Sequence, residues 1–372
     1  MLAKTRFARR PDRARLRPGA WLLLGCLVAL ALRPPPILVT PGPDQDVHSL
    51  HPILGVHTRL TDEVELWKIE RSLELTREMG AGTIVEFFPW AYYEPAPGRF
   101  AWEHPDAVIE HAAAQGLTVI ARLGLTPDWA RPADTPLSYL DAGAFDDFAD
   151  FAAAFAARYA DRLPAIIIGN EPNLSFEWGY RQASAEEYVA LLRAVYPAVK
   201  RANPAMRVLG GALAPNLEPG GSPWAINDLV YLDQLYRLGA AEYFDVLAVH
   251  VYGLTFPPQA APGPEVLNFR RVELMREVML AHGDGETPIL ITETGWNDHP
   301  RWTRAVRPAQ RIRYTLDAVR YAEANWPYVE LVALWALRYP APSHSYADYF
   351  TLITPEFVAK PIYDELKRFT GN

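Results

Sequence analysis

The sequence predicts an α/β fold, a single (β/α)8 barrel, from two regularities that run through it. Eight short, almost continuously apolar runs recur after residue 50, at residues 52–57, 82–88, 117–123, 165–170, 207–213, 244–252, 288–294 and 329–337. Segments with helical periodicity lie between them, such as EVELWKIERSLELTREMG and DDFADFAAAFAARYADR. Successive runs start 30 to 48 residues apart, which is the length of one strand–helix unit with its loops.

The runs are typical of strands buried on both faces, as in a parallel sheet that helices cover. Eight such units close into a TIM barrel. A doubly wound open sheet is the alternative architecture. However, the first run leads into GVHTRL rather than a glycine-rich phosphate loop, so it would make a poor dinucleotide site.

The N-terminus predicts export from the cytoplasm. Residues 1–17 hold seven Lys and Arg against one Asp, and they lead into the apolar run WLLLGCLVALAL at 21–32. This pattern indicates a signal peptide, with Ala29-Leu30-Ala31 as its cleavage site, or, if uncleaved, an N-terminal signal anchor. We therefore assign residues 1–32 to that segment and expect an extracytoplasmic protein, either secreted or anchored to the membrane.

The rest of the chain divides into a linker and one domain. Residues 33–50 hold five prolines and no amphipathic period, so we interpret them as a Pro-rich tether. Residues 51–372 form the predicted barrel domain. The one cysteine, Cys26, lies in the N-terminal apolar run, so this domain would have no disulfide. The net charge of -8 argues against a nucleic-acid partner, which would require a basic face.

Polar and aromatic residues recur near the C-terminal ends of the predicted strands, where a barrel of this kind carries its functional groups. They are His57, Trp90, Arg122, Asn170, Glu171, His250, Tyr252, Glu293, Trp296 and Trp335. Three strand–helix units separate Glu171 from Glu293, so the two carboxyl groups would face each other across the mouth of a closed ring. Paired carboxyl groups suit glycosidic bond cleavage, with one as proton donor and the other as nucleophile.

The remaining residues have two interpretations each. His250 and Tyr252 alternate on one face of their strand, as site residues or as core filling. Trp335 is either a floor on which a sugar ring stacks or part of the core. His57, Arg122, Trp90 and Trp296 either contact substrate or serve packing. We interpret Glu86 as a helix N-terminal charge or a member of a loop ion pair.

Two motifs resemble the retaining glycoside hydrolases of clan A. They are GNEPN at 169–173 and TETGW at 292–296, on the predicted fourth and seventh strands. PWAYYEPAPGRFAWE at 89–103 and PEFVAKPIYDEL at 355–366 are also similar to clan segments, so the resemblance spans about residues 52–368. Families 39 and 5 are the nearest in pattern. Clan members often have an Arg near the end of the second strand, where this chain has Phe87 and Phe88.

The resemblance implies that Glu171 is the acid/base, that Glu293 is the nucleophile and that Asn170 binds the sugar 2-hydroxyl. It also implies that Tyr252 touches the nucleophile. The implied activity is hydrolysis of β-linked oligo- or polysaccharides, as in cellulases, xylosidases or mannanases, without a metal or other cofactor. We expect a monomer. Two alternatives are a metal-dependent sugar isomerase or epimerase, with Glu171, His250 and Glu293 as ligands, and a non-catalytic carbohydrate-binding barrel.

Overall fold

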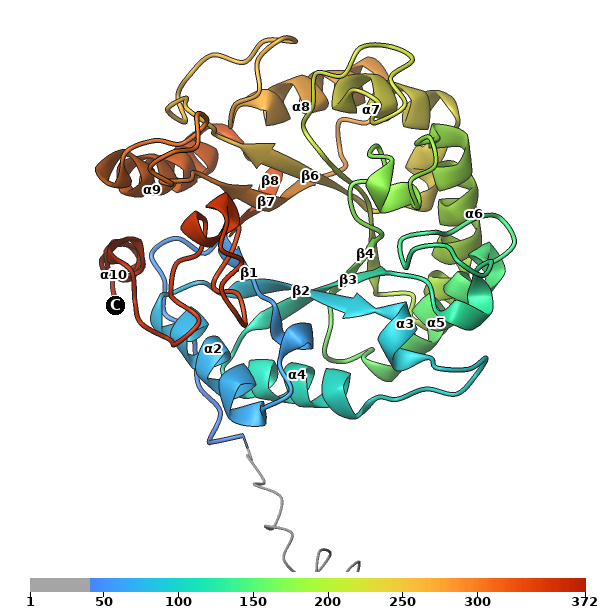
Figure 1. The fold of residues 1–372 in the computed structure, drawn as a ribbon, viewed down its shortest axis with the longest axis horizontal. Coiled ribbons are helices and arrows are strands. Elements are labelled where there is room, and N and C mark those ends of the chain that lie inside the picture. Colours follow the sequence, from blue (N-terminus) through green and yellow to red (C-terminus); the bar gives the residue numbers. More distant parts are fainter. Residues whose placement is uncertain (1–40) are drawn as a thin grey trace, which may run out of the picture. The chain divides into compact units, whose positions relative to one another are not determined.

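A computed structural model describes residues 41–372, so the predicted signal peptide or anchor at 1–32 lies outside the described residues. Eight parallel strands pair in sequence order and close into a barrel (Figure 1). They are β1 (Leu54–His57), β2 (Thr83–Pro89), β3 (Thr118–Gly124), β4 (Ala165–Ile168), β5 (Arg207–Leu213), β6 (Val246–Tyr252), β7 (Ile289–Gly295) and β8 (Val329–Leu334). The predicted (β/α)8 fold and all eight predicted strands are confirmed.

Helices surround this barrel as an outer layer (Figure 1). They are α2 (Leu66–Glu78), α3 (Trp90–Tyr93), α4 (Glu103–Ala114), α5 (Phe145–Arg158), α6 (Ala185–Ala202), α7 (Asp228–Arg237), α8 (Arg271–Ala281), α9 (Pro308–Asn325) and α10 (Pro361–Phe369). Among residues 41–372, none of the helices combines the length and the apolar composition that a bilayer span requires.

The apolar core has two layers. A small cluster includes Val85, Ile120, Ile167, Ala248 and Leu331, one or more from each of several strands. A much larger cluster joins the other faces of the strands to the helices, and it includes Phe148, Phe151 and Phe155 of α5. The strands are therefore buried on both faces, which is why their sequences are continuously apolar.

The described part of the predicted linker is not a free tether. Residues 41–50 form no helix or strand. The Gln45 N–H nevertheless donates to the Ala114 carbonyl at 2.8 Å, and the Leu50 N–H donates to the Thr370 carbonyl at 3.0 Å. The Asn372 amide also donates to the His48 carbonyl at 2.8 Å. Residues 45–50 therefore belong to the barrel domain, where they contact the end of α4 and residues 370–372 at the C-terminus.

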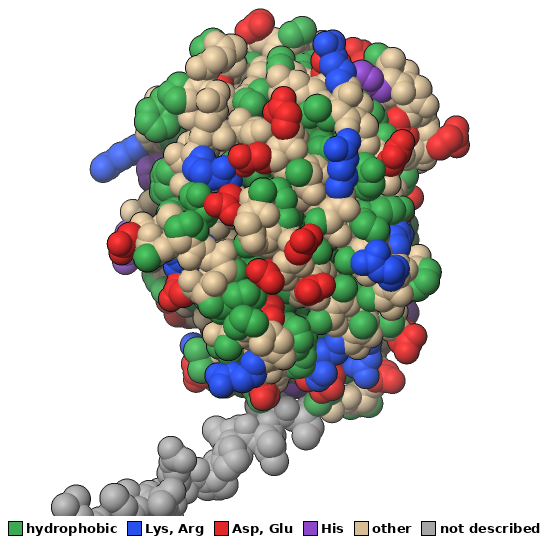
Figure 2. Space-filling model, turned by 90° about the vertical axis from the view of Figure 1, so that its right-hand side faces the viewer, with side chains coloured by type: hydrophobic (Ala, Val, Ile, Leu, Met, Phe, Trp, Pro, Cys, Tyr) green, Lys and Arg blue, Asp and Glu red, His purple; other side chains and the backbone are tan. Residues whose placement is uncertain are grey.

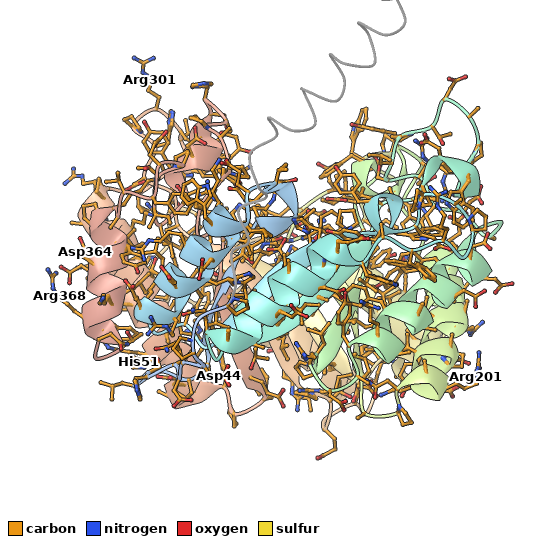
Figure 3. All side chains as sticks on the ribbon, turned by 90° about the horizontal axis from the view of Figure 1, so that it is seen from below. Asp44, His51, Arg201, Arg301, Asp364 and Arg368 are labelled. Carbon is orange, nitrogen blue, oxygen red and sulfur yellow. The ribbon has the colours of Figure 1, made fainter. Side chains whose placement is uncertain are left out.

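The two ends of the barrel carry different segments. Figure 3 shows Arg301, in the loop after β7, at one end, and Asp44, His51 and Arg201 toward the other. On the side formed by α5 and α6, acidic and basic side chains are interspersed without one sign of charge gathering (Figure 2). The polar residues at the C-terminal ends of the strands lie at the same end of the barrel as Arg301, because the loops that follow the strands all lie at that end.

Candidate active site

The side chains that fill the barrel become polar toward its C-terminal end. Side chains alternate along a strand, so residues two apart point the same way. On β3 the apolar Ile120 of the inner cluster is followed by Arg122, and on β6 Ala248 is followed by His250 and then Tyr252. On β8, Ala333 is followed by Trp335, just past the last strand residue. On each of these strands, the residues that point into the barrel are thus apolar at first and polar or aromatic at the C-terminal end.

An irregularity in β7 brings Glu293 into this series. Leu290 belongs to the inner cluster, so strict alternation would turn Glu293 to the other face. The pairing of β7 with β8 shifts between Ile291 and Thr294, and the pairing of β6 with β7 shifts next to His250. A shift of this kind re-aims a side chain. Glu293 consequently lines the same cavity as Arg122 and Tyr252.

Glu171 reaches the cavity through a tight bend after β4. The strand ends at Ile168, and Gly169 has φ of 75°. Glu171 itself has φ of 42°, a left-handed conformation that is uncommon outside glycine. Its N–H donates to the Ala212 carbonyl at 3.1 Å, and Pro172 follows it. The bend therefore ties Glu171 to β5 and turns its carboxyl group toward the cavity.

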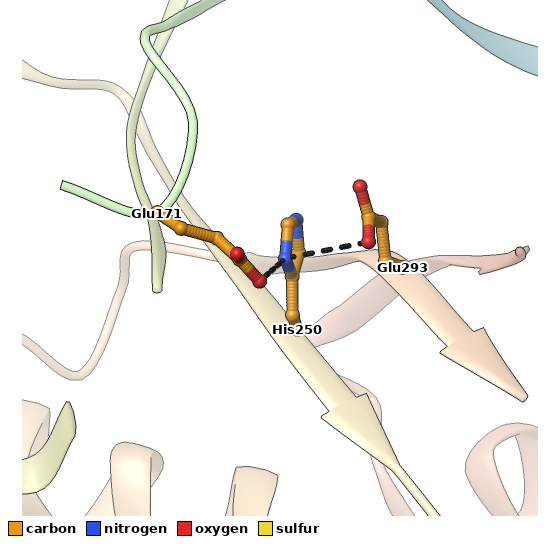
Figure 4. Close-up of side chains that lie close together, drawn as sticks. All are labelled: Glu171, His250 and Glu293. Carbon is orange, nitrogen blue, oxygen red and sulfur yellow. Dashed lines mark hydrogen bonds and ion pairs between the residues drawn. The ribbon is translucent and has the colours of Figure 1, made fainter. Parts of the chain in front are cut away.

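His250 lies between the two carboxyl groups (Figure 4). Its Nδ1 is 2.8 Å from Glu171 Oε1 and 3.6 Å from Glu293 Oε2. One carboxylate oxygen of Glu171 and one of Glu293 lie within 4.8 Å of each other. Burial lowers the pKa of His250, but the Glu293 charge and the Glu171 hydrogen bond outweigh burial and raise it. The two acids therefore make His250 easier to protonate than a free histidine.

Both oxygens of Glu293 receive hydrogen bonds. Arg122 donates to Oε1 at 3.1 Å, and the Tyr252 hydroxyl donates to Oε2 at 2.7 Å. Burial, together with the Glu293 charge, raises the pKa of Tyr252 well above its ordinary value, so this hydroxyl remains a donor. The two donors therefore fix the orientation of the Glu293 carboxylate. Arg122 also stacks on Phe87, one of the two residues that replace the expected strand-two Arg, at 4.7 Å from the ring centre.

His57 lies against Glu293 from the β1 side, fully buried. Its Nε2 is 3.8 Å from Glu293 Oε1, and its Nδ1 lies 2.9 Å from the Thr58 carbonyl. Because a carbonyl only accepts, Nδ1 carries the hydrogen. Burial and then the charge of Arg122 lower the pKa of His57 well below its ordinary value, so the ring is neutral. It also packs edge-on against Trp335, with ring centres 4.5 Å apart.

These groups surround a cavity of about 580 Å³ at the C-terminal end of the barrel. Glu171, Glu293, Asn170, Tyr252, Arg122 and Trp335 all line it. Most of the other lining residues were not predicted from the sequence; they include Arg59, Glu177, Arg304, Tyr339, Tyr346 and Phe350. The Trp335 indole N–H donates to the Tyr339 hydroxyl at 2.9 Å, and Trp302 stacks on Tyr346 at 4.7 Å between ring centres. The wall on the side of β8 is therefore largely aromatic.

Four residues that we predicted to contact substrate do not line the cavity. Trp90 is fully buried among Trp129, Phe148 and Phe151 in the helix layer. Trp296 is buried against Phe269 and Tyr314. For these two tryptophans the packing interpretation holds, because each points between strands and helices. His57 and His250 are also buried. They do not line the cavity, but His57 lies beside Glu293 and His250 lies between Glu171 and Glu293.

Glu86 lies at a helix N-terminus, as one of its two expected roles requires, but at that of the short 3-10 helix Leu60–Asp62 in the loop after β1. It is fully buried and accepts hydrogen bonds from the Thr58 hydroxyl at 2.6 Å and from the N–H groups of Leu60 at 2.9 Å and Thr61 at 3.1 Å. Burial raises its pKa. Glu86 therefore holds the loop after β1, as a buried carboxyl without an ion pair.

Glu171, His250 and Glu293 also form a potential metal-ligand set, since one ligand atom from each lies within 4.8 Å of the others. Two features of their surroundings disfavour a cation. Arg122 places a positive charge 3.1 Å from Glu293. The hydrogen bonds from Tyr252 to Glu293 and between His250 and Glu171 already use the oxygens that a cation would need. These contacts therefore disfavour a metal ion at this set of residues.

No protein-family model matches the chain, and no curated protein matches its sequence. Solved structures of glycoside hydrolases share its fold. A family 39 glycoside hydrolase from the gut symbiont Bacteroides cellulosilyticus WH2 has a TM-score of 0.68 at 20% identity, with 89% of this chain and 65% of that chain covered. An exo-beta-1,4-mannosidase from Opitutaceae bacterium strain TAV5 has a TM-score of 0.56 at 19% identity, with 89% and 61% covered.

A GH5_18 protein from Streptomyces cattleya, solved in complex with GlcNAc, has a TM-score of 0.63 at 17% identity, with 88% of this chain and 80% of that chain covered. The chain thus spans less than two thirds of the family 39 protein and of the mannosidase. At these identities the likeness establishes the barrel fold. The family 39 protein and the GH5_18 protein belong to the two families that the sequence motifs resemble.

Proposed function

We propose that this chain is a retaining glycoside hydrolase that cleaves β-linked saccharides, with Glu293 as nucleophile and Glu171 as acid/base. The separation of the two carboxyl groups carries the proposal. Oxygens of Glu171 and Glu293 lie within 4.8 Å. Retaining enzymes have carboxyl groups about 5–5.5 Å apart, whereas inverting enzymes need about 6.5–9.5 Å to admit a water molecule.

The reaction proceeds in two displacements. A Glu293 oxygen attacks the anomeric carbon, the bond from this carbon to the leaving oxygen breaks, and Glu171 gives its proton to that oxygen. Glu171, now a carboxylate, then takes a proton from water, whose oxygen attacks the same carbon and displaces Glu293. The side chain of Glu171 returns to its protonated state, and the sugar leaves with its original configuration.

The neighbouring side chains prepare Glu293 for attack. Tyr252 and Arg122 each hold one of its oxygens, which orients the carboxylate and supports its charge. His250 hydrogen-bonds Glu171 and lies close to Glu293, so one imidazole contacts both carboxyl groups and fixes their relative position. No group outside the chain is needed, because the two carboxyl groups supply both the nucleophile and the proton.

The cavity suits a sugar ring with an attached saccharide. Trp335, Tyr339, Trp302 and Tyr346 offer aromatic faces, which pack well against the C–H surface of a pyranose. The similar structures include an exo-beta-1,4-mannosidase and a protein bound to GlcNAc, which support a β-linked oligo- or polysaccharide as the substrate class. We infer that the protein acts outside the cytoplasm as a monomer, secreted or anchored through residues 1–32.

The test is hydrolysis of a panel of aryl β-glycosides and β-linked polysaccharides by the purified protein. We expect activity on at least one member, and a loss of at least about 10³-fold in kcat for Glu293→Ala. Azide should restore the turnover of Glu171→Ala on an activated aryl glycoside and yield a β-glycosyl azide. Glu265→Gln, at an exposed loop position, is the matched control and should retain activity.

Other outcomes distinguish the alternative functions. Loss of activity after chelation, with recovery on adding a divalent cation, would favour the metal-dependent barrel that the Glu171, His250 and Glu293 set permits. Binding of a glycan without turnover by a folded wild type would favour the non-catalytic barrel. A product of inverted configuration would contradict the double displacement.

A further inference from the structure

A third carboxyl group, that of Glu177, faces the same cavity. It lies in a short 3-10 helix, Phe176–Trp178, in the loop after β4, and it lines the cavity together with Asn170 and Glu171. Its Oε1 accepts a hydrogen bond from the side-chain amide of Asn170 at 2.7 Å. The two-step mechanism above uses Glu171 and Glu293 only, so Glu177 has no role in it.

Glu177 completes a chain of hydrogen bonds that leads to the nucleophile. Asn170 Oδ1 accepts from Arg122 at 2.6 Å, and the same Arg122 nitrogen lies 3.1 Å from Glu293 Oε1. Arg122 can only donate and an ionised Glu177 can only accept, so together they allow one orientation of the Asn170 amide. In that orientation its oxygen faces Arg122 and its nitrogen faces Glu177.

The loop that carries Glu177 is held by other contacts. The Trp178 indole N–H donates to Glu187 at 2.8 Å, and Arg181 donates to the same carboxylate at 2.7 Å. The Ser138 hydroxyl also donates to the Phe176 carbonyl at 2.7 Å. Glu187 therefore anchors this loop to α6, and the Glu177 side chain remains directed at Asn170.

The protonation of Glu177 changes near neutral pH. Burial raises the pKa of Glu177 to about 7, the hydrogen bond from Asn170 opposes this rise, and the charges of Glu171 and Glu293 add to it while Arg122 lowers it. A protonated Glu177 could donate as well as accept, so the amide of Asn170 would lose its single orientation.

We propose that Glu177 is a positioning residue of this site, whose carboxylate fixes the Asn170 amide so that its second N–H hydrogen stays available to the substrate. The proposal rests on the glycosidase function proposed above. It predicts that Glu177 acts through Asn170 rather than on the reacting atoms. A displacement of a substrate contact of this kind costs up to about 10²-fold in rate.

The experiment is a double-mutant cycle on the best aryl glycoside found in the panel. We expect Glu177→Ala to lower kcat/KM by about 10-fold or more in the wild-type background and by less than about 2-fold when Asn170→Ala is already present. Glu177→Gln cannot titrate and, like the protonated acid, can donate as well as accept, so it leaves the Asn170 amide without a single orientation. It should show at every pH the lower activity that wild type has below about pH 7, and it should lack the rise toward the alkaline side that the wild-type profile has near pH 7.

Glu187→Gln is the matched control, because it weakens the anchor of the same loop without touching Asn170. A purely structural role for Glu177 predicts equal losses for Glu177→Gln and Glu187→Gln, and it predicts that the effects of Glu177→Ala and Asn170→Ala add. Either result overturns the proposal. If Glu177→Ala does not fold, Glu177→Gln and its pH profile decide the matter.

The two proposals fail in different ways. A wild type that cleaves no glycoside while remaining folded contradicts the proposed function. A wild type that is active, with Glu177→Ala, Glu177→Gln and wild type within 2-fold at every pH, contradicts the role of Glu177 and leaves the function intact.

Discussion

At the scale of single residues, Tyr252 connects a barrel strand to the carboxylate of Glu293. It is the last residue of β6, and its hydroxyl donates to Glu293 Oε2 at 2.7 Å. Replacing it by Phe removes one donor from a buried carboxylate and leaves the shape of the wall unchanged. We expect Tyr252→Phe to lower kcat by about 10- to 100-fold with little change in KM, since in the proposed mechanism the contact matters most when Glu293 attacks the anomeric carbon.

Tyr180→Phe is the control for this prediction, because Tyr180 is 73% exposed and does not line the cavity. Steady-state kinetics of both variants on one substrate is the measurement. A Tyr252→Phe enzyme with unchanged kcat and a raised KM would mean that Tyr252 contacts the substrate instead of preparing the nucleophile.

Glu177 also predicts a dependence of stability on pH. Its pKa is raised from 4.5 to about 7, so the folded state holds this proton more tightly than the unfolded state. The resulting stabilisation is complete below about pH 4.5 and is lost as the pH rises through about 7. Gln does not titrate, so the stability of Glu177→Gln relative to wild type should increase from pH 5 to pH 8, by about 1–2 kcal/mol after allowance for solvent screening.

Urea unfolding of wild type and Glu177→Gln at both pH values measures this difference. A gap that stays constant between pH 5 and pH 8 would show that Glu177 does not titrate in this range.

Individual residues differ in how far the sequence could predict their positions. Arg122, His250 and Tyr252 continue an apolar strand by steps of two, so the pattern itself directs them inward. Trp90 and Trp296 follow strands in the same way, yet both pack in the helix layer, because an aromatic residue just past a strand can turn to either side. Glu177 was missed because a 3-10 turn in a loop leaves no periodic signal.

At the scale of elements, the junction of β6 with the loop after β7 is tightly packed. Gly253 directly follows β6, and a Cβ atom placed there would lie 1.8 Å from the ring of Trp296. Both parts are buried, so neither can move away freely. We expect Gly253→Ala to destabilise the fold by at least about 3 kcal/mol and to reduce activity through its neighbour Tyr252.

Gly82→Ala provides the comparison, since a Cβ atom at that position meets no atom within 4 Å. Thermal unfolding monitored by circular dichroism should give a clearly lower melting temperature for Gly253→Ala and a nearly unchanged one for Gly82→Ala. Equal melting temperatures would mean that the Trp296 side chain can repack.

The strands themselves were predictable, and their ends less so. The predicted fourth strand extends to residue 170, whereas β4 ends at Ile168. The backbone turns at Gly169 and Glu171, both with positive φ, at the point where the chain leaves the sheet and lines the cavity. The apolar sequence pattern of a strand reflects burial, and burial continues to the mouth of the barrel. Hydrogen-bonded pairing between strands stops earlier, where the backbone bends and the side chains of Asn170 and Glu171 line the cavity.

At the scale of the whole molecule, the two ends of the barrel serve different purposes. The C-terminal end holds the cavity, and the other end is where residues 45–50 pair with Ala114, Thr370 and Asn372. The five prolines of residues 33–50 led us to predict a tether, but hydrogen bonds made by backbone atoms are independent of side-chain type. Such pairing could not be predicted from composition.

This arrangement predicts that stability and activity can be separated. A chain that begins at residue 51 loses the three hydrogen bonds to Ala114, Thr370 and Asn372, the hydrogen bond between Ser49 and His51, and the packing of Val47 against the core. At about 1 kcal/mol for each hydrogen bond, we expect it to be about 2–4 kcal/mol less stable than a chain that begins at residue 41. The kcat/KM values of the two should agree within about 2-fold, because the lost contacts lie at the end of the barrel away from the cavity. Chemical unfolding and kinetics of both chains provide the test, and equal stability would restore the tether interpretation for residues 41–50.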